Sequence, residues 1–333
     1  MANLFNVTNL KKTYYYLKRN GVMQTIGAAL ERVQAPYFAD YDYVLPSKQE
    51  LELQRNMEWK NPPVFSVVVP AYETKEEFLE ILIKSMLEQT YSYWELVIAD
   101  ASSSDKVKKQ CEKYKDNRIQ YFSLENNAGI SENTNQGMEK ATGDYIGLLD
   151  HDDYLTPDAL YEMASAIKKG KENHLEYGFL YSDEDKCDET GTHFYDPHFK
   201  TDFNLDLFLT NNYICHFCVM KKKLVQNLRF RKEYDGAQDY DIFLRAVGEL
   251  WKQNPKVEET IYHVPKVLYH WRCHNDSTAA NPQSKRYAYD AGRRAVQDFV
   301  NQRGWDATVE EMAHVGFYKV VYKDGVPYRD FKE

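Results

Sequence analysis

The sequence lacks a long apolar run, a basic excess and the glycine-rich loops that hold phosphates in many nucleotide-binding proteins. No segment approaches the roughly 18 consecutive apolar residues of a membrane-spanning helix, and the first residues include no apolar segment of the signal-peptide type. The formal net charge of −9 argues against a nucleic-acid binder, because neutralising the phosphate backbone requires a basic surface. We therefore expect a cytoplasmic protein that does not bind nucleic acid.

The five cysteines are odd in number and scattered, which is not the pattern of a disulfide framework. The run Cys215-His216-Phe217-Cys218, together with Cys273 and His274, suggests zinc, but its spacing fits only one half of a zinc site. Residues 214–220 are more typical of a buried strand. Neither G-x-x-x-x-G-K-[ST] nor G-x-G-x-x-G follows a predicted strand, so P-loop and Rossmann dinucleotide sites are disfavoured.

Residues 1–62 differ from the rest of the chain. Between residues 10 and 33, apolar positions recur at helical spacing beside lysine and arginine, which predicts two short amphipathic helices. We interpret this segment as a helical extension and linker packed on the main domain, with docking to a membrane surface or a partner as the alternative. The predicted units are an extension over 1–62, a main domain over 63–280, and a C-terminal helix and hairpin over 281–333.

From residue 64 onward, strand and helix patterns alternate. The apolar run over 64–69 predicts a strand buried on both faces, and Thr74 with Glu77 predicts a capping box for the next helix. Such alternation is typical of an α/β fold with helices on both faces of the sheet, where ligands bind beyond the carboxyl ends of the strands. Because Asp100 and Asp150 follow two predicted strands, we expect both acids on one rim of the sheet.

Residues 150–153, Asp-His-Asp-Asp, place three carboxylates within four positions. Clustered carboxylates suit hard divalent cations such as Mg²⁺ or Mn²⁺, which complete their coordination with substrate phosphates. A solvated acidic turn is the alternative. The position of the cluster between a buried strand and a predicted helix favours a functional site.

Four sequence blocks stand at 67–72 (VVVPAY), 95–100 (ELVIAD), 126–131 (NNAGIS) and 149–153 (LDHDD), and their order and spacing carry a resemblance. Together they resemble the family-two glycosyltransferases, which have the GT-A fold. Later blocks at 181–185, 236–241 and 270–272 resemble a bacterial branch of rhamnosyltransferases and of O-antigen and capsule transferases. The resemblance implies a mixed sheet flanked by helices, with a nucleotide-sugar half over 63–155 and an acceptor half over 156–280.

The resemblance also implies how the donor is held. Asp100 is expected to accept a hydrogen bond from the N3–H of uracil or thymine. A turn cap involving residues 102–104 stays open as its alternative, and Ala101 replaces a second Asp of the usual family pattern. The base pocket is implied to be lined by Pro70, Ala71 and Tyr72. The other implied donor contacts are Ala128, Gly129, Asp150 and Arg272.

A divalent ion, Mn²⁺ or Mg²⁺, is implied at Asp150 and Asp152, with His270 completing its coordination. The ion would neutralise the charge that develops on the departing diphosphate. A purely structural histidine is the alternative for His270.

The position of Asp239 matches that of the catalytic aspartate of the family, so the resemblance implies that Asp239 is the general base. Gln238 departs from the glutamate that usually precedes it. An N-cap of the helix that follows is the alternative for Asp239, and Asp241 is a rival base. The residues expected to contact the acceptor are Asp183, Glu184 and Trp271.

The resulting interpretation is an inverting, metal-dependent glycosyltransferase that moves L-rhamnose from dTDP-rhamnose to a cell-surface polysaccharide. UDP-hexose and UDP-N-acetylhexosamine are alternative donors. The expected location is the cytoplasm, with peripheral contact to the inner face of the membrane or to a polysaccharide-assembly complex. A nucleotidyltransferase would need a glycine-rich loop where residues 70–73 stand. A non-catalytic glycan-binding module stays open as the alternative from another class.

Overall fold

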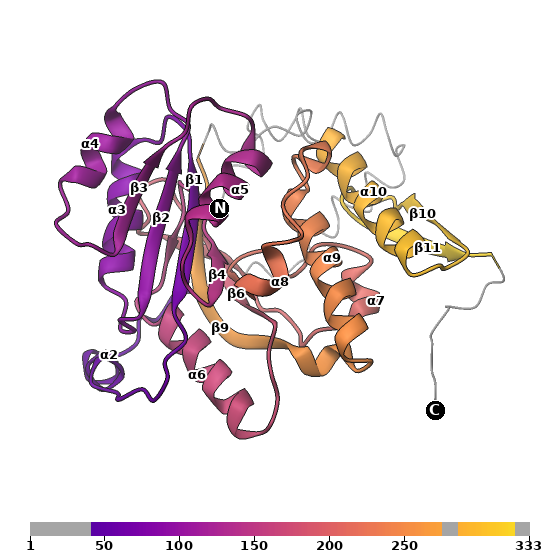
Figure 1. Ribbon diagram of the computed structural model, residues 1–333, viewed down its shortest axis with the longest axis horizontal. Helices are drawn as coiled ribbons and strands as arrows, with labels where there is room; N and C mark the ends of the chain where they lie inside the picture. The colour runs from indigo at the N-terminus through magenta and orange to yellow at the C-terminus, as the bar shows by residue number, and fades with distance from the viewer. Residues whose placement is uncertain (1–40, 275–285, 324–333) are drawn as a thin grey trace.

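The computed structural model describes residues 41–274 and 286–323, and one nine-stranded sheet organises this part of the chain (Figure 1). Its strands are β1 (Phe65–Ala71), β2 (Trp94–Asp100), β3 (Ile119–Ser123), β4 (Tyr145–Leu148), β5 (Tyr154–Leu155), β6 (Phe179–Cys187), β7 (Phe194–His198), β8 (Cys218–Lys221) and β9 (Ile261–Arg272). They are arranged in the order β3-β2-β1-β4-β8-β6-β9-β5, and β7 pairs with β6. The two helices predicted between residues 10 and 33 lie outside the described residues.

The sheet has a parallel half and a mixed half. Strands β3, β2, β1 and β4 run parallel, as the alternation of strands and helices predicted. Strand β8 runs antiparallel to both β4 and β6, whereas β6 and β9 are parallel over nine paired positions. The prediction of a mixed α/β sheet is therefore confirmed. Strand β1 extends beyond the predicted end at residue 69, through Pro70 to Ala71.

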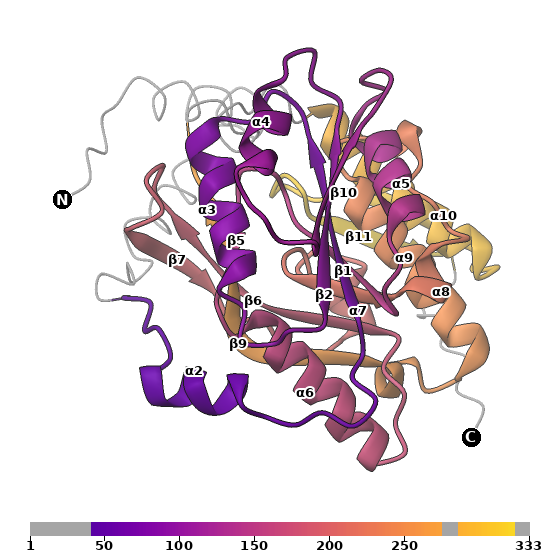
Figure 2. The ribbon, with the colours of Figure 1, turned by 60° about the vertical axis from the view of Figure 1, so that its left-hand side comes forward.

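Helices cover both faces of the sheet. They are α2 (Lys48–Arg55), α3 (Glu76–Leu87), α4 (Lys106–Glu112), α5 (Ile130–Lys140), α6 (Ala159–Glu172), α7 (Leu205–Phe208), α8 (Lys222–Val225), α9 (Gln238–Gln253) and α10 (Arg286–Gln302), with short 3-10 turns η1 (Lys232–Tyr234) and η2 (Val257–Thr260). On β1, Val68 packs into the apolar cluster shared with α5, α9 and α10, whereas Val67 and Val69 pack into the cluster shared with α3, α4 and α6. Because neighbouring strand residues point to opposite faces, these two clusters lie on opposite faces of the sheet, and Figure 2 shows α3 and α5 on opposite sides of β1 and β2.

The capping box predicted at Thr74 is wrong. Helix α3 begins at Glu76, and its N-cap residue is Lys75, which makes no side-chain capping hydrogen bond. The Thr74 hydroxyl instead lies 3.0 Å from Nδ1 of His151, in the acidic turn after β4. A contact between distant segments has replaced the local cap.

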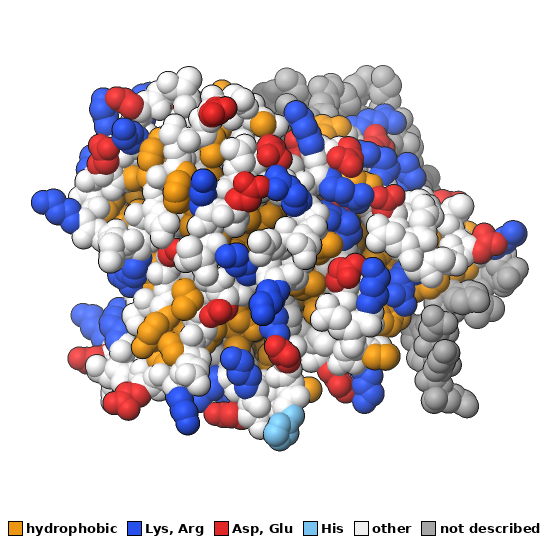
Figure 3. Space-filling view, viewed as in Figure 1, with side chains coloured by type: hydrophobic (Ala, Val, Ile, Leu, Met, Phe, Trp, Pro, Cys, Tyr) orange, Lys and Arg blue, Asp and Glu red, His pale blue; other side chains and the backbone are white. Residues whose placement is uncertain are grey.

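The C-terminal part packs on α9. Helix α10 and the antiparallel hairpin of β10 (Ala307–Glu311) and β11 (Tyr318–Tyr322) lie beside α9 in Figure 1. Arg231 binds both Asp241 of α9 and Asp298 of α10, which ties the two helices together. Over the described part of the face in Figure 3, acidic and basic side chains are interspersed. None of the helices within 41–274 and 286–323 is long and apolar enough to cross a bilayer.

Candidate active site

Two acids sit at the carboxyl ends of the two parallel strands that flank β1, as expected. Asp100 is the last residue of β2, where it is paired with Ala71 of β1. Asp150 lies two residues beyond the end of β4, which pairs with the other side of β1. The side chain of Asp150 is 45% exposed. Its dense protein surroundings raise its pKa, His216 lowers it, and the neighbouring Asp152 raises it further.

The acidic turn at residues 150–153 is held in place by residues of β9. Asp153 is buried and accepts hydrogen bonds from the hydroxyl of Tyr269, at 2.5 Å, and from the backbone N–H of Arg272, at 2.7 Å. The fully buried guanidinium of Arg272 donates to the carbonyl oxygens of Asp152 and Glu189. Arg272 thus braces the turn by hydrogen bonds to the backbone of Asp152 and the side chain of Asp153. The contact of Arg272 with a donor phosphate stays a prediction.

The structure pairs Asp152 with a different histidine from the one predicted. Nε2 of His274 lies 2.8 Å from Oδ2 of Asp152. His270 is buried, and its Nδ1 lies 2.6 Å from Oδ1 of Asp185. Within the described ranges no group of three His, Cys, Asp or Glu side chains is arranged to hold a metal ion. The two acids of the predicted metal site therefore share one turn, whereas His270 is engaged with Asp185.

Asp239 faces Asp150 across a small cavity. The cavity has a volume of about 20 Å³, and its lining joins the ends of β1 and β4 to helices α5 and α9. Asp239 stands in the first turn of α9 without capping it, because Ala237 is the N-cap residue. Among the described residues, the Asp239 carboxylate has no hydrogen-bond partner. Burial and then repulsion from Asp150 raise the pKa of Asp239 to about 7, whereas His216 lowers it.

Asp241, the other candidate for the general base, takes part in buried ion pairs. Asp241 is buried and binds the guanidinium groups of Arg231 and Arg245. Its position two residues after Asp239 turns it away from the cavity that Asp239 lines. Asp241 therefore stabilises the packing around α9, and the assignment of the general base to Asp239 stays a prediction.

Asp100 is enclosed by its neighbours. Its Oδ1 accepts from the backbone N–H and the hydroxyl of Ser102, and its Oδ2 accepts from the hydroxyl of Tyr121 at 2.9 Å. The serine turn left open as the alternative is thus present, and only 1% of Asp100 is exposed. Of the residues predicted beside it, Ala71 is buried and Tyr72 is 50% exposed, whereas Pro70 lines the small cavity of Asp150 and Asp239.

The loop before α5 is held against the segment before α9. Gly129 has a φ of +99°, and a Cβ at this position would lie 3.0 Å from Oδ2 of Asp235. Ser131, in the first turn of α5, donates to the same carboxylate. The backbone N–H of Ala128 donates to Asn133 at 3.3 Å. The predicted donor contacts Ala128 and Gly129 therefore lie on a loop that packs against Asp235, in the segment before α9.

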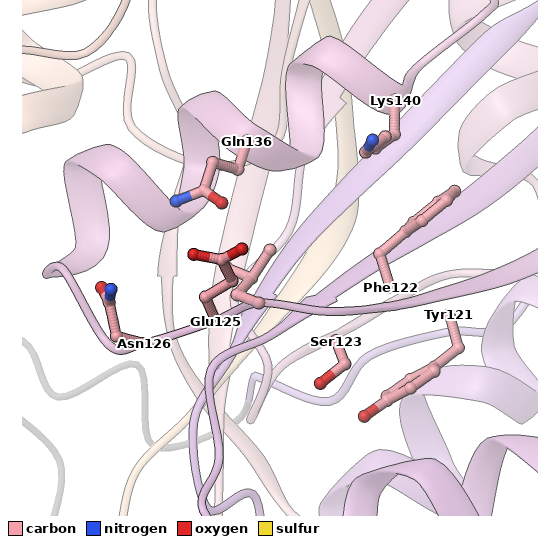
Figure 4. Close-up of a pocket in the computed structure, with 8 residues that line it drawn as sticks. Tyr121, Phe122, Ser123, Glu125, Asn126, Gln136 and Lys140 are labelled. Atoms are coloured by element: carbon pink, nitrogen blue, oxygen red, sulfur yellow. The ribbon is translucent and has the colours of Figure 1, made fainter.

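A larger cavity opens at the edge of the parallel half. It has a volume of about 430 Å³ and lies between the end of β3 and helix α5. Figure 4 shows Gln136 and Lys140 reaching toward it from α5, with Glu125 and Asn126 on the connecting loop. Tyr121 connects this cavity to the predicted nucleobase pocket, because the hydroxyl of this tyrosine donates to Asp100. No sequence pattern indicated this cavity.

Two of the predicted acceptor residues lie beside His216, for which the sequence pattern suggested only a zinc-binding role. Nδ1 of His216 lies 3.1 Å from Glu184, and its ring centroid lies 5.6 Å from that of Trp271. Asp183 is instead buried and bound to His263 and to the backbone N–H of Lys200. No local pattern could have found His216, because its partners come from β6 and β9.

Comparison with known proteins agrees with the resemblance of the sequence blocks. Residues 66–229 match Glycosyl transferase family 2. The putative colanic acid biosynthesis glycosyl transferase WcaA of Escherichia coli (strain K12) is 32% identical over 203 residues, covering 58% of this chain and 70% of WcaA. The O-antigen biosynthesis protein RfbC of Myxococcus xanthus is 29% identical over 305 residues, covering 89% of this chain and 23% of RfbC. The chain therefore belongs to glycosyl transferase family 2.

The fold agrees with that assignment. A crystal structure of S. aureus TarS in complex with UDP-GlcNAc superposes with a TM-score of 0.54 at 20% identity, covering 72% of this chain and 67% of the TarS chain. At this identity the likeness concerns the fold alone, and it confirms the GT-A prediction. This chain spans about a quarter of the length of two of its curated relatives, RfbC among them.

Proposed function

We propose that this chain transfers a sugar from a nucleotide diphosphate to a saccharide acceptor with inversion, using Asp239 as the general base. The acceptor hydroxyl oxygen attacks the anomeric carbon, the bond from that carbon to the diphosphate oxygen breaks, and Asp239 takes the hydroxyl proton. The observation that carries the proposal is the carboxylate of Asp239, which has no hydrogen-bond partner among the described residues and faces Asp150 across a shared cavity. Its pKa of about 7 suits a base that works near neutral pH.

The donor diphosphate is proposed to bind at Asp150 and Asp152 together with Mg²⁺ or Mn²⁺. Their oxygen ligands fit such an ion, since hard cations prefer carboxylates and complete their shell with phosphate oxygens. Asp150 also has an exposed carboxylate beside Asp152, which raises its pKa, and a bound cation would relieve that repulsion. When bound, the ion supplies Lewis-acid stabilisation of the leaving diphosphate. His270 is omitted from this set because Asp185 holds it.

The proposed donor is dTDP-rhamnose, with UDP-hexose and UDP-N-acetylhexosamine as alternatives. The proposed acceptor is a cell-surface polysaccharide, in line with the names of WcaA and RfbC, and the reaction is placed at the cytoplasmic face of the membrane. On the acceptor side, Trp271 is half-buried next to His216 and offers a flat apolar face to a sugar ring. Sugar selectivity rests on a few pocket contacts.

The test is nucleotide release from a panel of dTDP- and UDP-sugars with Mn²⁺ or Mg²⁺, measured with and without EDTA. Hydrolysis or transfer of one donor is expected, and both EDTA and Asp152→Ala should abolish it. The matched control is Asp306→Ala, which removes a surface ion pair with Lys323 and should leave turnover unchanged. If no donor turns over and calorimetry detects no metal-dependent binding of UDP or dTDP, the chain is a glycan-binding module and this proposal fails.

A further inference from the structure

His216 is in contact with both halves of the proposed active site. It lies in the loop before β8, and its Nδ1 lies 3.1 Å from Oε2 of Glu184. Its Nε2 lies 3.2 Å from Sγ of the adjacent Cys215 and 3.8 Å from Oδ2 of Asp150. The ring stacks on Tyr269 with a centroid distance of 4.7 Å and an angle of 17°. Three directions of the imidazole are thus set by β6, by the acidic turn and by β9.

The loop that carries His216 is held by a buried lysine. The side chain of Lys200 is completely buried, and its Nζ donates to the carbonyl oxygens of Ile214, Cys215 and His216. The same Nζ lies 3.3 Å from Glu184. A buried ammonium group is tolerated only when such partners replace its water. Burial alone would raise the pKa of Glu184, but Lys200 and then His216 outweigh it, so the pKa stays below its ordinary value.

Tyr269 connects the same arrangement to the backbone of the acidic turn. Its hydroxyl donates to Asp153 at 2.5 Å and accepts from the backbone N–H of Asp150 at 3.4 Å. His216 therefore rests on the ring that anchors the turn and faces the carboxylate that the turn presents. Asp150 in turn lines the cavity that holds Asp239.

We propose that His216 is a positioning residue of the transfer reaction, which Glu184, Lys200 and Tyr269 hold against Asp150 so that this carboxylate keeps its place for the donor diphosphate. The inference rests on the proposed function, because it assigns Asp150 to the donor. Partners that orient a carboxylate at such a site typically contribute about 10- to 100-fold to affinity or activity. His216 acts through Asp150 and does not itself take part in proton transfer.

The test is the affinity for UDP and dTDP in the presence of Mn²⁺, measured by calorimetry on the full chain. His216→Phe keeps a ring on Tyr269 but removes both nitrogens, and we expect it to weaken nucleotide binding by about 10- to 100-fold. His216→Gln restores an N–H group directed at Asp150 and should recover most of the affinity. The matched control is His198→Phe, because His198 approaches the other oxygen of Glu184 at 3.5 Å and is 46% exposed. Its nucleotide affinity should match that of the unaltered chain.

A double-mutant cycle with Asp150→Asn separates positioning from general damage. If His216 acts through Asp150, adding His216→Phe to Asp150→Asn should weaken nucleotide binding no further. Additive losses, an unchanged affinity of His216→Phe, or a His216→Gln variant as weak as His216→Phe would each overturn the inference. Failure of the unaltered chain to bind either nucleotide would instead overturn the proposed function. Thermal melting of each variant confirms that the folded protein is compared.

Discussion

The parallel half and the mixed half of the sheet build their parts of the site in different ways. In the parallel half, Asp100 and Asp150 reach the rim because each stands at the end of a buried strand. In the mixed half, the side chains near the site are held by buried polar pairs, such as Asp183 with His263 and Lys200 with Glu184. Position along a strand brings the first two acids to the rim, where Tyr121 and β9 then hold them, whereas the side chains of the mixed half depend on partners from elsewhere in the fold for their place as well.

The two halves therefore differ in what their stability depends on. Apolar packing on both faces supports the strands of the parallel half, and this packing tolerates exchange of one aliphatic residue for another of similar volume. A buried ionic group is less tolerant, because loss of one partner leaves the other uncompensated. Substitutions that remove one member of a buried polar pair should therefore lower the free energy of unfolding in the mixed half more than conservative aliphatic exchanges do in the parallel half.

The largest effect is expected from Asp239→Asn, which removes the proposed base without disturbing a hydrogen bond among the described residues. Its kcat/KM should fall by about 10²- to 10⁴-fold, with the melting temperature unchanged. Asp241→Asn, two residues further along α9, breaks buried pairs with Arg231 and Arg245 and should mainly lower the melting temperature. Turnover and thermal melting of both variants check this contrast. Turnover of Asp239→Asn within tenfold of the unaltered chain would exclude Asp239 as the base.

Lys200→Met tests the buried polar network of the mixed half. It leaves Glu184 and three backbone carbonyls without their cation, so the free energy of unfolding should fall by about 3–5 kcal/mol. The control is Lys266→Met, which removes an ion pair with Glu162 that is partly exposed to solvent. That change should cost only about 0–1 kcal/mol. Urea unfolding measures both, and equal losses would contradict the difference between buried and exposed pairs.

Gly137→Ala tests the packing of the parallel half. A Cβ at residue 137 of α5 would lie 2.7 Å from Cγ1 of Val68 on β1, so the helix must shift from the sheet. We expect a loss of about 1–3 kcal/mol in the free energy of unfolding. Gly248→Ala in α9 is the control, since its nearest neighbour would be Phe299 at 3.7 Å. There the helix should gain about 0.5–1 kcal/mol, and chemical denaturation that shows the same sign for both would refute the packing argument.

The pH dependence should show the smallest effect. The pKa of Asp239 is raised to about 7 by burial and by Asp150, so the group is protonated below that pH and cannot accept a proton. Activity is therefore lost as the pH falls, with kcat/KM decreasing about tenfold for each pH unit below the midpoint. Initial rates between about pH 5.5 and 8.5 at fixed Mn²⁺ measure this limb. A profile that stays flat through neutral pH would show that another group accepts the proton.

Local sequence patterns could predict the strands of the parallel half but not the caps of the helices. Thr74 satisfies the pattern of a capping box, yet its hydroxyl bonds His151 in the turn after β4. Asp239 satisfies the pattern of an N-cap, yet α9 begins two residues earlier than that role requires. Thr74 contacts a neighbouring segment and Asp239 lines a cavity, and the sequence near each residue does not distinguish these roles from a cap.

The residues around the site illustrate the same limit. Two histidines lie near the end of β9, and the resemblance implied that His270 completes the metal site with Asp152. In the structure His274 lies beside Asp152, and His270 contacts Asp185. His270 lies two residues before the end of β9 and His274 lies two residues after it, and no local pattern decides which of them meets Asp152. The choice depends on how β9 is aligned with β6, where a register shift at residues 182–184 changes which side chains meet.

The sequence by itself determined the α/β class, the family and the acids that end β2 and follow β4. These are local properties, since apolar runs and the residues directly after them are read within a few positions. Only the tertiary structure decided that Lys200 holds the loop of His216, and that His274 faces Asp152 across 122 positions of the chain. Such pairs form because buried charges and polar groups must find partners when water is removed, and the partner is set by the packing of the whole sheet.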